Sequence, residues 1–123
     1  MLIIRTAEAL AHALDSPLHP ISRERLRLHA ERLAEYDVPL EELALFAVVR
    51  SDDTLDDLEQ QCALRLVADD YFAVTPELVE QEGPWVEVVF ILSDNGFGLV
   101  LLVELAEATD PHLAAACRKH LGQ

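Results

Sequence analysis

Two apolar runs separated by a short polar segment constrain the fold of this chain more than any other feature. VEVVFIL (86–92) and LVLLVEL (99–105) have the length and composition of β-strands, and SDNGFG (93–98) lies between them. Asn95-Gly96 between such runs is a strong hairpin signal, because both residues tolerate the positive φ of a type I′ turn. Both faces of the predicted hairpin are mainly apolar, so helices or a partner must cover both.

The glycines of SDNGFG do not form a phosphate or calcium loop. A dinucleotide-binding fingerprint needs a third glycine and a following helix, whereas Leu101 and a strand stand there. A P-loop needs Gly-Lys-Ser/Thr, and the only lysine of the chain is Lys119. A calcium loop needs oxygen ligands at alternate positions, but apolar residues follow Asn95 until Glu104. The segment is therefore interpreted as a turn.

Helix signals and one further apolar run complete the predicted fold. The run LALFAVV (43–49) predicts a buried strand, and capping residues with helical periodicity predict five helices. These elements predict one α+β domain over residues 1–123, with helices packed on a small antiparallel sheet. The expected strands lie near 43–49, 86–92 and 99–105, and the expected helices near 7–15, 23–36, 55–64, 76–82 and 111–121.

The net charge of −14 is concentrated in the middle of the chain. Residues 36–110 hold 18 acidic residues and two arginines, whereas acids and bases balance in residues 1–35. A field of this sign repels phosphate backbones and anionic lipid headgroups, so neither nucleic acid nor a membrane is an expected partner. The sequence has no apolar run of membrane-spanning length and no secretory signal, which predicts a cytoplasmic protein.

Cysteines and histidines do not form a recognisable site. Cys62 and Cys117 are far apart and are expected to be reduced core residues, with a disulfide or a reactive thiol as the alternative. Cys117 and His120 are three positions apart on one predicted helix, but a zinc site needs three or four ligands. No nucleophile motif such as G-x-S-x-G is present. The sequence therefore predicts no metal, no cofactor and no catalytic residue.

One pair of carboxylates follows from the predicted hairpin. A two-residue Asn95-Gly96 loop places Glu87 opposite Glu104 on one sheet face. Directly opposed like charges destabilise a sheet unless a cation, a proton or water relieves them, so the pair is a candidate for metal binding or acid–base chemistry. The alternative is that both side chains splay apart at the wet end of the hairpin, or that a bulge removes the opposition.

The absence of a catalytic motif and the lopsided acidity favour a protein-interaction module over an enzyme. In size and charge the chain resembles bacterial immunity and anti-restriction proteins, with no motif in common, so the resemblance implies only a binding, inhibitory or immunity-like role. The alternative function is a small ligand- or metal-binding domain, or an enzyme, that uses Glu87 and Glu104.

Two surfaces are expected to carry an interaction. The first surface is acidic and suits a basic partner; it comprises Asp52, Asp53, Asp56 and Asp57. The competing interpretation is that these acids are turn and helix-start residues. The second surface is apolar and lies on the hairpin; it comprises Trp85, Val89, Ile91, Val100 and Leu102. It is expected to form a homodimer, because the shorter helices do not reach across the second face of the sheet. Trp85 has an alternative interpretation as a buried residue that caps the core.

Overall fold

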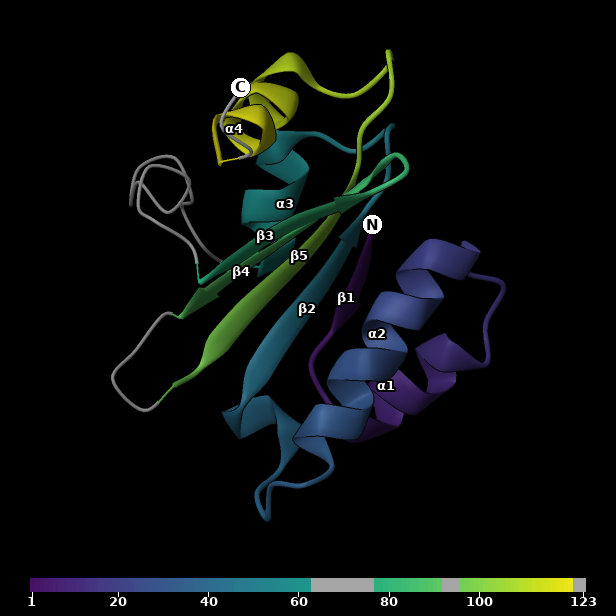
Figure 1. The fold of residues 1–123 in the computed structure, drawn as a ribbon, viewed down its shortest axis with the longest axis vertical. Helices are drawn as coiled ribbons and strands as arrows, with labels where there is room; N and C mark the ends of the chain where they lie inside the picture. The colour runs from purple at the N-terminus through teal and green to yellow at the C-terminus, as the bar shows by residue number, and fades with distance from the viewer. Residues whose placement is uncertain (63–76, 92–95, 121–123) are drawn as a thin grey trace.

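Strands β4 (Trp85–Ile91) and β5 (Gly98–Glu104) form the antiparallel pair that the two apolar runs predict. They belong to a five-stranded sheet with the order β1-β2-β5-β4-β3 (Figure 1). The structure is a computed structural model and describes residues 1–62, 77–91 and 96–120. Strand β5 lies at the centre of the sheet, where both faces are buried, and this explains its nearly continuous apolar sequence.

The sheet is mixed, which corrects the predicted antiparallel sheet. Strand β2 (Ala44–Val49) runs parallel to β5, while β1 (Leu2–Ile4) pairs antiparallel with β2. Parallel neighbours need a crossover connection, and the chain between β2 and β5 supplies one that includes helix α3 (Leu55–Cys62). The α+β class and the single domain are confirmed.

The helix predicted near 76–82 is wrong, because Leu78–Glu82 forms the edge strand β3. Its misleading signals were Pro76 as a helix start and Gly83 as a helix end. Gly83 instead has a φ of 58° in the two-residue turn to β4, where Glu82 pairs with Trp85. A positive φ at the first central position, followed by proline, suits a type II′ hairpin turn.

The register of the β4–β5 hairpin differs by two residues from the predicted one. Glu87 pairs with Leu102, and Ile91 pairs with Gly98, so the connection is longer than the two residues Asn95-Gly96. Residues 92–95 of this connection lie outside the described ranges. Gly98 also donates its amide to the carbonyl of Leu43 at 2.9 Å, which fixes the start of β5 against the β2 side of the sheet. A shift of two residues leaves every side chain on its predicted face.

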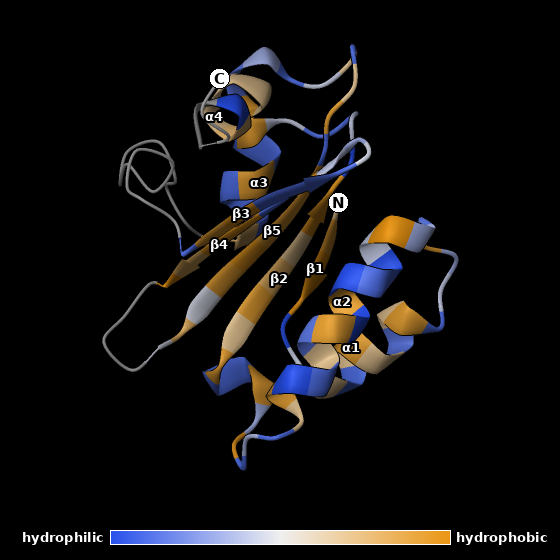
Figure 2. Cartoon of the chain, in the orientation of Figure 1, coloured by the Kyte–Doolittle hydropathy of each residue, from blue (hydrophilic) through white to orange (hydrophobic). Residues whose placement is uncertain are grey.

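Helices cover both faces of the sheet. Helices α1 (Ala7–Leu14) and α2 (Pro20–Leu33) pack on one face, and α3 and α4 (Pro111–His120) pack on the other (Figure 1). Each face has its own apolar core, and strands β1, β2, β4 and β5 are hydrophobic along most of their length, whereas the edge strand β3 is largely hydrophilic (Figure 2). The expectation that one face would lack a cover is therefore wrong.

The helix starts depend on local caps. The hydroxyl of Thr6 accepts the amide of Ala9 at 3.1 Å and begins α1. Thr54 and Asp57 form a capping box at the start of α3, with two bonds of 3.1 Å. Helix α2 begins three residues earlier than predicted, because Pro20 takes its first position and His19 accepts the amide of Ile21.

Helix α2 is held to the sheet through Leu26, which is fully buried. We expect Leu26→Ala to lower the free energy of unfolding by about 2–5 kcal/mol, because the change leaves a cavity in the core. Leu28→Ala, on the same helix, is the matched control: Leu28 is 45% exposed, so the loss should be much smaller. Urea denaturation of both variants measures the difference, and equal losses would contradict this placement of α2.

Candidate functional site

The predicted acidic surface lies at the start of α3 and is partly used for local structure. Asp57 belongs to the capping box, and Asp53 accepts the amide of Arg50 at 2.9 Å. Asp53 also pairs with the ammonium group of Met1 at 3.1 Å. Asp52 and Asp56 are exposed. This geometry agrees with the alternative interpretation as turn and helix-start residues, while binding of a basic partner there stays a prediction.

The predicted apolar interface is mostly buried within the chain. Trp85, Val100 and Leu102 are at most 4% exposed, because α1 and α2 cover them. Val89 is half-buried, and only Ile91, at 48%, is exposed. The interpretation of Trp85 as a core residue is confirmed. The homodimer stays a prediction, but the uncovered sheet face on which it was based does not exist.

The predicted carboxylate pair is wrong in its geometry. Glu87 and Glu104 share a sheet face, but the register places Glu104 opposite Trp85 rather than opposite Glu87. Glu104 lies near the amide of Ser51, at 3.4 Å. Within the described part of the chain, no three His, Cys, Asp or Glu side chains are grouped so that they could hold a metal ion.

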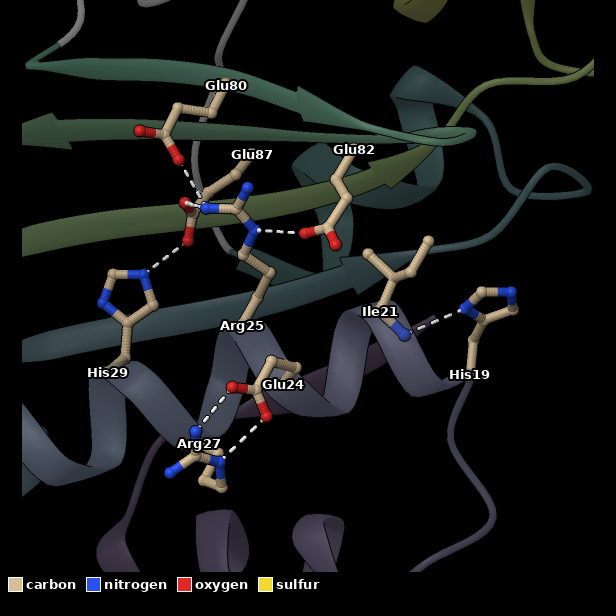
Figure 3. A network of polar contacts seen from close by, with 9 residues as sticks. All are labelled: His19, Ile21, Glu24, Arg25, Arg27, His29, Glu80, Glu82 and Glu87. Carbon is tan, nitrogen blue, oxygen red and sulfur yellow. Dashed lines mark hydrogen bonds and ion pairs between the residues drawn. The ribbon is translucent and has the colours of Figure 1, made fainter.

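Glu87 is instead the centre of a cluster that the sequence did not reveal. Its side chain is 3% exposed, and both carboxylate oxygens have partners on α2 (Figure 3). Nη1 of Arg25 donates to Oε2 at 3.2 Å, and Nε2 of His29 lies 2.5 Å from Oε1. Arg25 and His29 are four positions apart, so they lie on the same side of the helix, one turn from each other. The rings of His29 and Phe46 lie in a T-shaped arrangement, with their centroids 5.6 Å apart.

Arg25 also contacts two carboxylates of the edge strand β3. Its guanidinium lies 2.5 Å from Glu80 and 3.3 Å from Glu82 (Figure 3). Glu80 is the register partner of Glu87, and these neighbouring like charges would repel each other without a cation between them. The hydrogen bond that Arg25 donates to Glu80, aided by the charges of Glu87 and Glu82, raises the pKa of Arg25. Arg25 therefore joins α2 to both β3 and β4.

A cleft opens beside this cluster, between α2 and strands β3 and β4. It has a volume of about 540 Å³, and we call it the α2–β3 cleft. Its apolar lining includes Leu28 of α2, Leu78 of β3 and Ile91 of β4. Its polar lining includes His29 and Arg32. The cleft thus combines apolar walls with charged and hydrogen-bonding groups, as ligand pockets commonly do.

A second hollow, the apolar groove, lies on the side of α2 that faces α1. Its volume is about 350 Å³, and it extends from the α1–α2 contact to the 3-10 helix η1 (Leu40–Glu42). Small side chains such as Ala11 and Ala34 line it. Tyr36 and Val38 at its end are 57% and 45% exposed.

The two cysteines are buried and unpaired, as predicted. Desolvation raises the pKa of Cys117 to about 12 and also raises that of Cys62. A protonated, buried thiol is a poor nucleophile. The side chain of His120 lies outside the description, so the Cys117–His120 pair is not tested.

The raised thiol pKa values predict a loss of stability at alkaline pH. Unfolded thiols ionise near pH 8.5, whereas the folded ones stay protonated, so the unfolded state binds fewer protons above that pH. The free energy of unfolding should therefore fall as the pH rises past about 8.5, and less so in a Cys62→Ala/Cys117→Ala variant. A thiol reagent should label the native protein only after denaturant is added. Rapid labelling of the native protein would contradict the burial.

The role of Arg25 is tested by Arg25→Ala. We expect a loss of about 3 kcal/mol in the free energy of unfolding, because Glu87 would remain buried with only His29 as a partner. Arg27→Ala is the matched control on the same helix, because the ion pairs of Arg27 with Glu24 and Glu31 are exposed and should matter far less. Chemical denaturation decides, and equal effects of the two changes would show that the cluster does not hold α2 in place.

Comparison with known proteins finds no match for this chain among protein-family models, curated proteins or solved structures. Within the described ranges, no helix has both the length and the apolar character needed to cross a lipid bilayer. A functional argument therefore depends on the geometry of the two hollows and on the charges around them.

Proposed function

We propose that this protein is a non-catalytic interaction module of the cytoplasm that binds a basic, amphipathic helix of a partner protein in the apolar groove. The observation that supports this most is the groove itself, with exposed Tyr36 and Val38 at its end. Single exposed apolar residues are ordinary on a protein surface, but apolar side chains around a hollow are typical of binding sites. The small residues Ala11 and Ala34 leave room for large side chains of a partner.

The charge around the groove supports a basic occupant. Four exposed acids are immediate chain neighbours of lining residues, namely Glu35, Asp37, Glu41 and Glu42. Together they form what we call the acidic rim. A helix with leucine-like residues on one face and lysines or arginines on the other would meet apolar surface at its centre and opposite charge at its edge. Nucleic acid is not proposed, because the net charge of −14 repels it.

The role that follows is binding or inhibition rather than catalysis. The Glu87–Glu104 geometry on which the enzymatic alternative depended is not present, since Glu87 is occupied by Arg25 and His29. Buried, protonated cysteines suit a reducing compartment, which is consistent with the cytoplasmic location that we propose.

A designed helical peptide with leucines on one face and lysines on the other tests the groove. We expect Ala34→Trp to weaken peptide binding at least about tenfold, because the indole fills the groove. Ala115→Trp, at an exposed position of α4, should leave peptide binding unchanged. Fluorescence anisotropy of the labelled peptide measures both, and a peptide with glutamates in place of lysines should not bind. Equal binding by the two tryptophan variants would overturn the proposal.

The acidic rim and the acidic residues at α3 can be separated in the same assay. Glu41→Gln/Glu42→Gln should weaken binding and reduce its salt dependence, since the Debye length falls from about 30 Å at 0.01 M salt to about 10 Å at 0.1 M. Asp52→Asn/Asp56→Asn removes the same charge from the surface at α3 and should have little effect. The reverse result would assign the interaction to the surface at α3 instead.

A further inference from the structure

We propose that the α2–β3 cleft binds a free α-amino acid with an apolar side chain. This site is independent of the apolar groove, because the two hollows lie on different sides of α2 and share no lining residue. The volume of about 540 Å³ accommodates a ligand of this size. The argument depends on which polar groups of the cleft are already used and which are not.

Glu87, the buried member of the cluster, uses both of its carboxylate oxygens. Glu87 accepts from Arg25 and is bonded to His29, while Arg25 is shared among Glu87, Glu80 and Glu82. Glu80 and Glu82 each give one oxygen to Arg25, whereas Glu87 has no oxygen left for a ligand cation. The cluster therefore forms the fixed floor of the cleft.

Three polar groups of the cleft have no such partner among the described residues. The guanidinium of Arg32 forms no ion pair, and the carboxylate of Glu77 accepts no hydrogen bond, within the ranges that the structure covers. The third group is Nδ1 of His29, which points away from Glu87 (Figure 3). When neutral His29 donates its Nε2 proton to Glu87, Nδ1 is left as a hydrogen-bond acceptor.

These three groups match the polar end of an amino acid. Arg32 suits a carboxylate, which a guanidinium binds through two parallel hydrogen bonds. Glu77 and Nδ1 of His29 are acceptors, which suit an ammonium group with three donors. A zwitterion carries no net charge, so the negative field of the protein does not repel it as it would a simple anion.

The apolar walls define the side chain of the ligand. Leu28 and Ile91 are 45% and 48% exposed, which is unusual for large aliphatic residues in this molecule, and both line the cleft. Leu78 and Val89 beside them are half-buried. A branched aliphatic or aromatic side chain would bury these surfaces, whereas a polar one would leave them in contact with water.

Calorimetric titration with L-leucine and two analogues tests the proposal. We expect L-leucine to bind with a dissociation constant of about 1 mM or below, within the ligand efficiency of small molecules. L-leucinamide lacks the carboxylate and 4-methylpentanoate lacks the ammonium group, so each should bind at least about tenfold more weakly. In NMR spectra, leucine should shift the ring resonances of His29, assigned with His29→Gln.

Two matched variants locate the site. Arg32→Gln should weaken leucine binding at least about tenfold, while Arg27→Gln, which removes the same charge from a residue outside the cleft, should not. Arg32 is exposed, so this variant should fold, and unchanged circular dichroism checks that it does. The proposal is overturned if saturating leucine leaves the His29 resonances unmoved, if both arginine variants bind alike, or if leucinamide binds as well as leucine.

Discussion

A single buried carboxylate sets the position of α2 and, through it, the surface on either side of that helix. Among the described residues, the other buried side chains on the sheet face of Glu87 are apolar, and an unpaired charge there would cost several kcal/mol. Arg25 and His29 both reach it from successive turns of α2, which allows only a narrow range of rotations and translations of the helix over the sheet. Leu26, which lies between them in sequence, then enters the core as a consequence.

This orientation places a hollow on each of two sides of α2. Turning Arg25 and His29 toward β4 places Leu28 and Arg32 beside the α2–β3 cleft and directs Ala30 and Ala34 into the apolar groove. A rotation of α2 would alter both hollows together. The buried cluster thus positions both hollows, and it also lines one of them, the α2–β3 cleft.

The sequence indicates many of the helices and strands, but it does not indicate which distant segments of the chain pair with one another. The hairpin of two apolar strands, the capping box at Thr54 and the core cysteines follow from local composition, and the structure agrees with them. The β4–β5 register depends on contacts of Gly98 with another strand, which no local signal reveals. The edge strand β3 was misread because proline and glycine mark helix ends and hairpin turns alike.

The cluster around Glu87 was missed for a related reason. The acidic partners of Arg25 lie more than fifty positions away, so no local spacing indicates them, unlike the partners of Arg27 at three and four positions. The only available signal was Glu87 itself, a charge inside an apolar strand that needs a partner. The sequence indicated that Glu87 needs a partner, but the predicted register placed Glu104 opposite it. The predicted fold had no helix over that face of the sheet.

The position of β5 between β2 and β4 has a consequence for how the chain assembles. Strand β2 is made early and leaves the ribosome with one edge unpaired, because its parallel neighbour emerges only after β3 and β4. The central strand is therefore the last of the five to be synthesised, and it pairs with β2 along one edge and with β4 along the other. Such non-local pairing slows folding and lengthens the time during which an apolar edge is exposed to other nascent chains. In the cell, a newly made chain would be a natural client for a chaperone until β5 closes the sheet.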